Sequence, residues 1–245
     1  MIYEASEFTF TPPPLISRAR RVLIKPNAVD EQPYPVNTSR EMLSVIIDSI
    51  KRVSDADIII LEGTSTGEPI YPVYKALGYD FPRVLMLDVK DCIWVEVENP
   101  LPHPFAVATF WVPNVVISSD HLISVTPHRV SGKNGFFSIK NLLSLLPVSK
   151  YQGDASGGWG ALNEFGMDKV IADLYFTLPF DLGIIDARQK LFYETGRLQG
   201  RVEKYGKIFA GEPYEIDREA SQIDKLASGY LELIEAGKSE LETWG

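Results

Sequence analysis

The fold of this chain is decided between residues 21 and 62. The sequence there begins Arg21-Val22-Leu23-Ile24-Lys25 and ends Asp57-Ile58-Ile59-Ile60-Leu61-Glu62. Short, continuous apolar runs of this kind are typical of strands covered on both faces, as in parallel sheets. Between the two runs, Thr38 and Glu41 form a capping-box pair, and apolar residues then recur at helical spacing. This stretch therefore predicts a strand, a helix and a second strand.

The rest of the chain continues this alternation. Helices are predicted near residues 70–77, 138–146 and 162–178 and from Asp217 onward, and strands near 83–88, 182–185 and 207–210. Residues 92–126 are β-rich and punctuated by proline, which suggests an antiparallel addition. An irregular N-terminal arm, a polar loop over 127–137 and a flexible loop over 153–160 complete the prediction. We predict a single α/β domain over residues 1–245, a layered sandwich whose mostly parallel or mixed sheet is flanked by helices.

Composition limits the classes of partner. With 45% hydrophobic residues, the chain can bury a sizeable core. Its 24 basic and 33 acidic residues give a net charge of −9. An acidic surface repels phosphate backbones, so we expect no nucleic-acid partner. A local basic pocket for a small anion is compatible with this net charge.

The single cysteine, Cys92, bears on redox chemistry and location. One cysteine allows no disulfide within the chain and no cysteine-based iron–sulfur cluster. Its apolar surroundings favour a buried small hydrophobe over a reactive thiol. No apolar run approaches the roughly 18 residues of a membrane span, and no signal core is present. We therefore expect a cytoplasmic protein without a membrane partner. A homo-oligomer is left open.

Polar residues follow several predicted strands, where ligands bind in open parallel sheets. Lys25 and Asn27 follow the first strand, Glu62 the second and Asp186 a later one, with Asp217 beyond the last. Lysine supplies a point charge for a phosphate or carboxylate. The acids could transfer protons or hold a divalent cation through their oxygens. We take Lys25, Glu62 and Asp186 as candidate catalytic residues, Asn27 as a ligand-binding residue and Asp217 as a candidate metal ligand.

Each of these residues also has a structural explanation. Lys25 could end its strand in solvent, and Glu62 could be a loop carboxylate or a helix cap. Asp186 could accept hydrogen bonds from loop amides. Asp217 precedes a predicted helix, so N-capping is the favoured explanation there.

A second candidate region runs from Pro127 to Asn141. His128, Arg129 and Lys140 are cationic or can become so, and with Asn141 and a glycine-containing backbone they could bind an anion. The competing explanation for Lys140 and Asn141 is the solvated face of a helix, and the pattern alone favours it. No P-loop string and no Gly-x-Gly-x-x-Gly fingerprint follows the first strand.

The three histidines, His103, His121 and His128, lie within one section of the chain. A shared zinc site would need workable ligand spacing, and no His-Glu-x-x-His string is present. We therefore favour structural, hydrogen-bonded roles for the histidines over a three-histidine metal centre.

The order of motifs resembles the family named domain of unknown function 362. The resemblance covers roughly residues 20–225 and is most specific at Lys25-Pro26-Asn27 and Lys140-Asn141-Leu142-Leu143. It implies a shared site formed by Lys25, Asn27, Lys140, Asn141, Asp186 and Asp217. Some relatives carry ferredoxin-type cysteine motifs, which a single cysteine excludes here. The family usually shows a Lys-Thr-His string where this chain has Pro127-His128-Arg129-Val130-Ser131.

Two functional hypotheses follow. The first is an enzyme acting on a small anionic metabolite, with a divalent metal as one option, in which Lys25 and Lys140 hold the anion. The second is a non-catalytic protein that binds a partner or a redox or cofactor-assembly component. The second rests on the iron–sulfur modules of some relatives and on three aromatics that we expect to be exposed, Tyr151, Trp159 and Trp244.

Overall fold

The computed structural model describes residues 1–153, 158–178, 180–194 and 197–244. Part of the loop predicted over residues 153–160 therefore lies outside the described residues. The strands are β1 (Ile2–Glu4), β2 (Arg21–Lys25), β3 (Asp57–Glu62), β4 (Val84–Asp88), β5 (Trp94–Glu98), β6 (Thr109–Pro113), β7 (His121–Ser131), β8 (Asn134–Phe136), β9 (Leu182–Glu194) and β10 (Arg197–Gly211). The α-helices are α1 (Arg40–Val53), α2 (Tyr71–Ala76), α3 (Asn114–Ile117), α4 (Val148–Tyr151), α5 (Gly160–Asn163), α6 (Met167–Thr177), α7 (Pro213–Asp224) and α8 (Gly229–Trp244). The 3-10 helices are η1 (Pro14–Arg18), η2 (Val89–Asp91) and η3 (Lys140–Leu145).

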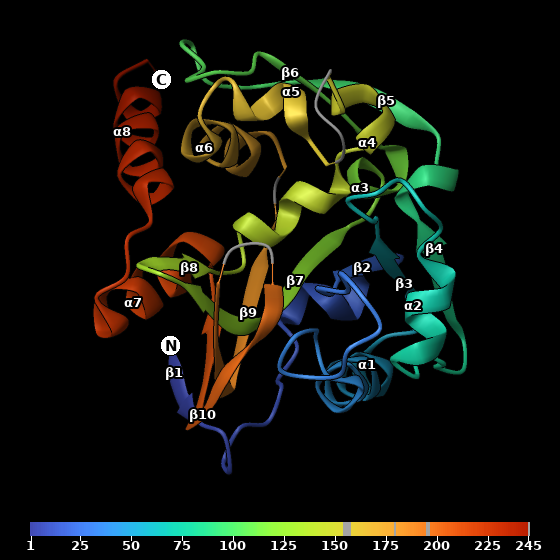
Figure 1. Cartoon of the computed structure of the whole chain (residues 1–245). Coiled ribbons are helices and arrows are strands. Elements are labelled where there is room, and N and C mark those ends of the chain that lie inside the picture. Colours follow the sequence, from blue (N-terminus) through green and yellow to red (C-terminus); the bar gives the residue numbers. More distant parts are fainter. Residues whose placement is uncertain (154–157, 179, 195–196, 245) are drawn as a thin grey trace.

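An eight-stranded mixed sheet organises the described part of the chain (Figure 1). Its order is β1-β10-β9-β7-β2-β3-β4, with β8 paired to β7. Strands β9, β7, β2, β3 and β4 are mutually parallel, so their carboxyl ends meet at one edge. The α/β prediction is confirmed. Strands β5 and β6 form a separate antiparallel pair, as the proline-punctuated section suggested.

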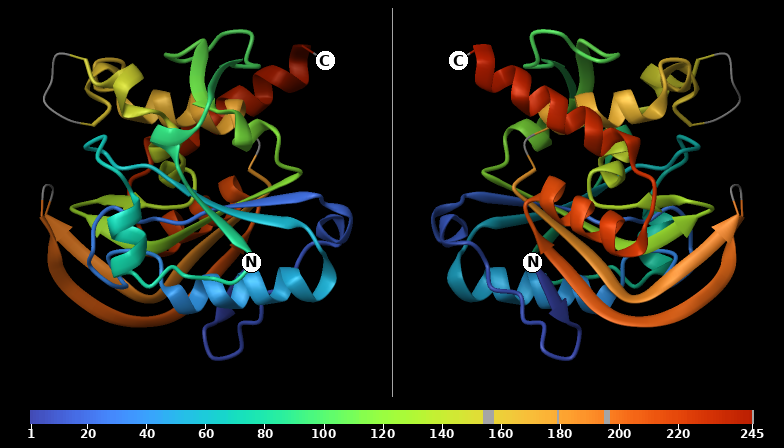
Figure 2. Two further views of the ribbon diagram at one scale, coloured as in Figure 1. Left: turned by 90° about the vertical axis from the view of Figure 1, so that its right-hand side faces the viewer. Right: turned by 90° about the vertical axis from the view of Figure 1, so that its left-hand side faces the viewer.

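Helices cover both faces of the sheet (Figure 2). On one face, Ile46 and Ile50 of α1 pack against Ile24 and Ile60 of the central strands. The other face packs against β6, η3 and α6, with Leu23 and Ile59 pointing into that core. Alternate residues of β2 thus enter different cores, because successive side chains of a strand point to opposite faces. Lys25 shares the face of Leu23, which directs it toward η3.

Helix α1 begins one residue later than its capping box predicted. Ser39 is the N-cap, and its hydroxyl accepts a hydrogen bond from the Met42 amide. The Thr38 hydroxyl instead accepts from the Asn27 amide and donates to the Val125 carbonyl. Thr38 therefore fixes the turn after β2 against β7, which is a tertiary role that local spacing does not reveal.

The prediction of a polar loop over residues 127–137 is wrong. Strand β7 continues through Pro127 to Ser131, and the chain turns at Gly132 into β8. Proline has no amide hydrogen and is tolerated at irregular points of a ladder. Here the register with β9 shifts between Pro127 and His128. Strands β9 and β10 are likewise longer than predicted and form one long hairpin, and β1 pairs with β10 where an irregular arm was expected.

Three predicted helices are divided or altered. The final helix is interrupted at Lys225, which adopts a left-handed conformation between α7 and α8. The helix expected over 162–178 is split by Gly166, whose φ of 86° precedes α6. The segment after Ser138 is the 3-10 helix η3. Within the β-rich section over residues 92–126, the short helix α3 precedes β7, which begins at His121.

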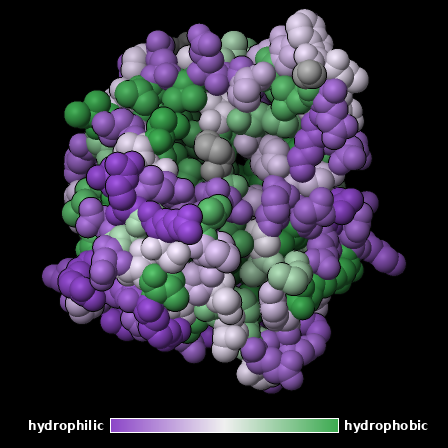
Figure 3. All heavy atoms as spheres, turned by 180° about the vertical axis from the view of Figure 1, so that it is seen from behind, coloured by the Kyte–Doolittle hydropathy of each residue, from purple (hydrophilic) through white to green (hydrophobic). Residues whose placement is uncertain are grey.

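Hydrophilic side chains dominate much of the surface seen from behind, with apolar residues gathered in its upper part (Figure 3). Within the described residues, no helix combines the length and the apolar character that crossing a membrane requires.

Candidate functional site

A buried ion pair joins the ends of β2 and β3. The Lys25 ammonium lies 2.7 Å from Glu62 Oε1, and the two side chains are 0% and 1% exposed. Lys25 Nζ also donates to the Pro26 carbonyl at 2.7 Å and to Asn141 Oδ1 at 3.4 Å. Burial lowers the pKa of Lys25, and the Glu62 carboxylate opposes that shift. All three ammonium hydrogens have acceptors, so Lys25 is held within the protein.

Glu62 is equally well satisfied. Its Oε1 accepts from the Gly63 amide at 2.9 Å and the Ser144 hydroxyl at 2.6 Å, and its Oε2 accepts from the Ala28 amide at 2.9 Å. A buried charge needs a partner and hydrogen bonds on its remaining lone pairs. The carboxylate therefore ties β3, the turn after β2, and η3 together.

Asn141 links this pair to the neighbouring turn. Its Oδ1 accepts from Asn27 Nδ2 at 3.2 Å as well as from Lys25, and its Nδ2 donates to the Ser124 hydroxyl at 3.1 Å. Asn27 Oδ1 is buried and has no hydrogen-bond partner among the described residues. An acceptor left open beside a cavity is a place where a ligand or water can donate.

A cavity of about 140 Å³ lies above this network, and we call it the basic cavity. Phe136 contributes an aromatic wall, and the polar lining comes from Asn27, Ser65, Thr126, Arg129, Lys140, Asn141 and Ser144. Four of the five predicted ligand-binding residues therefore line one cavity. Lys25 and Glu62 do not line it but contact Asn141 and Ser144, which do.

Arg129 and Lys140 are the unusual residues of the basic cavity. Arg129 is only 6% exposed, yet within the described residues neither its guanidinium nor the Lys140 ammonium forms a hydrogen bond or an ion pair. Both cations instead approach the Phe136 ring, with Lys140 Nζ 3.8 Å and the Arg129 guanidinium carbon 5.5 Å from its centroid. Burial lowers the pKa of Lys140, the Asp168 carboxylate opposes this shift, and the nearby Arg129 charge adds to it. Among the described residues, no carboxylate lies within ion-pair distance of either cation, and Glu62 and Asp30 act on Arg129, and Asp168 on Lys140, only from farther away.

Asp186 lies apart from the basic cavity, on the face of the sheet that α1 covers. Its Oδ2 is 2.8 Å from Arg188 Nη2, and its Oδ1 accepts from the Tyr34 hydroxyl at 3.1 Å. Arg188 also donates to the hydroxyl of Ser39, the N-cap of α1. These contacts occupy the carboxylate with partners that anchor the start of α1.

Asp217 was predicted to be the N-cap of the helix that follows it, and this prediction is wrong. It lies inside α7, whose N-cap is Glu212. Fully buried, Asp217 accepts hydrogen bonds from the Ser138 amide and hydroxyl and from the Ile139 amide, which lie just before η3. The Tyr230 hydroxyl supplies a fourth donor at 3.0 Å. A cation at Asp217 would have to displace these donors.

His128 is buried outside the basic cavity, on a different side of β7. Its Nε2 lies 2.7 Å from Asp224 Oδ2, although the two atoms are not aligned for a hydrogen bond, and Asp224 also pairs with Lys190. Burial lowers the pKa of His128. His121 pairs with Asp181 and His103 with Glu240, so each histidine has its own carboxylate. Within the described residues, no group of three histidine, cysteine or acidic side chains could hold a metal ion.

The aromatics expected to be exposed are mostly covered. Tyr151 is 8% exposed, and its hydroxyl accepts from the Trp111 amide. Trp159 is partly buried, lines the basic cavity and donates to the Leu146 carbonyl. Only Trp244 is open to solvent, at 70%.

Three important residues escaped the sequence analysis. Phe136 looked like part of a loop, Ser144 like part of a solvated helix face, and Gly63 like the end of a strand. A Cβ on Gly63 would lie 2.8 Å from the Ser144 carbonyl oxygen and 2.9 Å from Val89 Cβ. The glycine is therefore required by the close approach of β3 to η3. The only local signal that pointed to a site near these residues was the Lys140-Asn141 string, which begins four residues after Phe136.

The parallel strands and their helical layers define an α/β protein with a basic cavity beyond the carboxyl ends of β2 and β3. The chain belongs to the family described as a domain of unknown function, DUF362, which it matches over residues 22–222. This match confirms the resemblance found in the sequence.

The lactate racemase apoprotein from Thermoanaerobacterium thermosaccharolyticum has a similar fold, with a TM-score of 0.56 and 14% sequence identity. The similarity covers 89% of this chain and 53% of that chain, so this chain spans about half the length of its structural neighbour. Likeness at this level of identity concerns the fold alone. No curated protein matches the sequence.

Proposed function

We propose that this protein binds a small anionic metabolite in the basic cavity, as the substrate site of an enzyme. The observation that carries the proposal is the buried Arg129 guanidinium, which lies beside Lys140 without a carboxylate partner among the described residues. A buried charge is costly unless it is paired. In a chain with 33 acidic residues, none of the described ones pairs with this arginine. A bound carboxylate or phosphate would supply the missing charge.

The surrounding groups suit such a ligand. An arginine fork binds carboxylate and phosphate oxygens in pairs, and a lysine adds a point charge. Asn27 also lines the cavity, and its unpartnered Oδ1 offers an acceptor for a hydroxyl group of the ligand. The Lys25–Glu62 pair acts here as a positioning element, because it fixes Asn141 and Ser144 from below.

Lys140 is the group best suited to proton transfer. Its pKa is lowered by burial and by Arg129, and it lines the cavity where a ligand would lie. A lysine with a lowered pKa can act as a general acid or base nearer to neutral pH. Lactate, a small carboxylate in the name of the structural neighbour, is accordingly one of the probes we would test first.

Isothermal titration calorimetry with sulfate, phosphate and lactate tests the proposal. We expect at least one of these anions to bind the wild-type protein and Arg129→Gln to weaken that binding by tenfold or more, about 1.4 kcal/mol. Arg218→Gln is the matched control, because Arg218 is an exposed arginine paired with Glu215 on α7. Binding that is unchanged in Arg129→Gln, or absent from the wild-type protein with all three anions, would overturn the proposal.

A further inference from the structure

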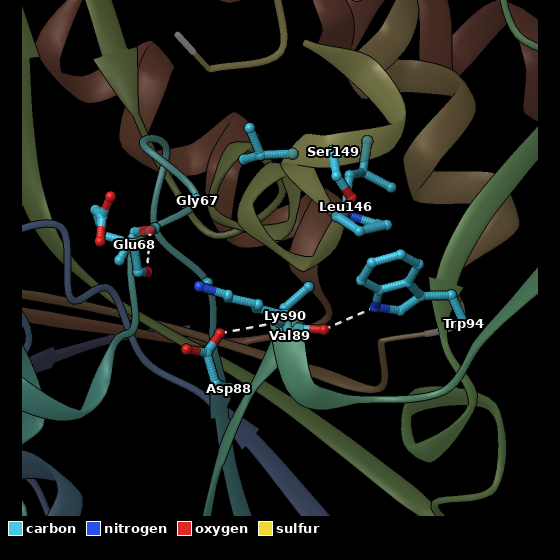
Figure 4. Close-up of a pocket in the computed structure, with 12 residues that line it drawn as sticks. Gly67, Glu68, Asp88, Val89, Lys90, Trp94, Leu146 and Ser149 are labelled. Carbon is cyan, nitrogen blue, oxygen red and sulfur yellow. Dashed lines mark hydrogen bonds between the residues drawn. The ribbon is translucent and has the colours of Figure 1, made fainter.

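A second cavity of about 260 Å³ shares the lining residue Gly63 with the basic cavity. Figure 4 shows this second cavity with Val89, Trp94 and Leu146 around it. We call it the apolar cavity, because Val89, Trp94, Leu146, Pro147 and Val148 form much of its wall. The Trp94 indole is held in place by a 2.7 Å hydrogen bond from Nε1 to the Val89 carbonyl. Its ring therefore presents a fixed apolar surface opposite the end of β3.

Some polar groups in this wall are satisfied by the protein itself, whereas the Lys90 and Glu68 side chains also line the cavity and have no side-chain partner among the described residues. Asp88 accepts hydrogen bonds from the Ile70 amide at 2.8 Å and the Lys90 amide at 2.9 Å. The Thr64 hydroxyl donates to the Glu68 carbonyl. Asp88 and Thr64 therefore offer a ligand little, and the apolar side chains provide most of the remaining contact surface.

The two cavities share a boundary. Gly63 lines both of them, and η3 presents Asn141 and Ser144 to the basic cavity while Leu146, just after η3, lines the apolar cavity. At this boundary the Ser144 carbonyl and Val89 pack directly against Gly63, in space that a Cβ would need, so only a single layer of atoms separates the cavities on that side. Neither cavity alone reaches the roughly 300 Å³ at which small-molecule sites begin, whereas together they exceed it.

We infer that the two cavities form one bipartite site, and that the ligand is an organic phosphate or carboxylate with an aromatic or branched aliphatic group. The anionic end binds Arg129 and Lys140, and the apolar group lies against Trp94 in the adjoining cavity. This inference rests on the proposed function and adds the substrate class. It predicts that affinity rises with the apolar group and that Trp94 carries this increase.

The test compares methyl phosphate, phenyl phosphate and 2-phenylethyl phosphate by calorimetry. In the wild-type protein, at least one of the two aromatic phosphates should bind tenfold or more tightly than methyl phosphate, since burying an apolar ring contributes at least this much. Trp94→Ala should reduce that advantage to about threefold or less and leave methyl phosphate binding unchanged. Trp244→Ala, which removes an exposed tryptophan at the end of α8, should keep the full advantage.

A second variant guards against a folding defect in Trp94→Ala. Ser149 is exposed and lines the apolar cavity, so Ser149→Phe should fill the cavity without disturbing the core. It should abolish the advantage of the aromatic phosphates while methyl phosphate still binds. If all three phosphates bind the wild-type protein equally, the bipartite site is wrong and the anion site stands. If none binds, the proposed function fails together with the inference.

Discussion

Lys25 and Glu62 form an ion pair with a 2.7 Å contact and essentially no exposed surface, at the ends of two adjacent parallel strands. Each charge has further hydrogen bonds, to the Pro26 carbonyl and Asn141 from Lys25 and to Gly63, Ala28 and Ser144 from Glu62. Arg129 lies nearby, and its guanidinium forms no hydrogen bond with the described residues. The described residues therefore satisfy one buried cation internally and leave the other without a hydrogen-bond partner.

Removing one partner of the Lys25–Glu62 pair should destabilise the fold strongly. In Lys25→Met, the Glu62 carboxylate stays buried without its counter-charge, and we expect the free energy of unfolding to fall by about 3–5 kcal/mol. Urea denaturation measures this change.

Two variants control this prediction. Lys207→Met breaks a partly exposed pair with Glu4 and should cost less than about 1 kcal/mol. Adding Glu62→Gln to Lys25→Met should recover part of the loss, because the unpaired charge is then removed. A Lys25→Met cost no larger than that of Lys207→Met would contradict the buried-pair argument.

Arg129→Met should separate binding from stability. Because the guanidinium is buried without a partner, an apolar side chain there should leave the free energy of unfolding unchanged or raise it by about 1 kcal/mol. Sulfate should raise the melting temperature of the wild-type protein but not of the variant. Thermal melts with and without sulfate measure both effects. A loss of more than about 2 kcal/mol would instead assign Arg129 a structural role.

Anion binding should weaken at alkaline pH through Lys140. Its pKa is lowered by burial, so its positive charge is lost as pH rises, below the range of an ordinary lysine. The sulfate dissociation constant should therefore increase as the pH rises toward the 10.5 of an ordinary lysine, while sulfate itself keeps its charge. Lys140→Arg should flatten this dependence, because arginine stays protonated. Equal pH profiles for the two proteins would show that another group controls the effect.

Asp217 should make stability depend on pH near neutrality. Burial raises its pKa to about 7, above its usual value of 3.8, although its hydrogen bonds oppose the shift. A raised folded-state pKa favours folding fully below about pH 4, and this contribution is lost as pH rises through about 7. Relative to Asp217→Asn, which cannot titrate, the wild-type free energy of unfolding should therefore fall between about pH 5 and pH 8.

Urea denaturation of both proteins at several pH values measures this difference. At the alkaline end of the range, where the two proteins differ least, Asp217→Asn should lower the free energy of unfolding by about 1–3 kcal/mol. The reason is that an amide cannot accept all four hydrogen bonds. A constant difference between the two proteins across the pH range would show that Asp217 does not titrate there.

Local sequence was sufficient for much of the architecture. The apolar runs ending at Lys25 and Glu62 and the helical spacing between them predicted the first parallel unit, because periodicity is a local property. Local signals gave wrong predictions where contacts between distant segments decided the secondary structure. Pro127 indicated a loop, yet the long strand β9 holds residues 127–131 in the sheet. The final helix looked continuous, yet the chain turns at Lys225.

The sequence by itself determined the α/β class and the residue types available beyond the strand ends. Only the tertiary structure decided their partners: Lys25 meets Glu62, Asp217 holds the start of η3, and Arg129 is left facing Lys140. The physical reason is that the energy of a buried charge depends on the groups packed around it. Those groups arrive from positions far along the chain, such as Asn141, which lies 116 residues beyond Lys25.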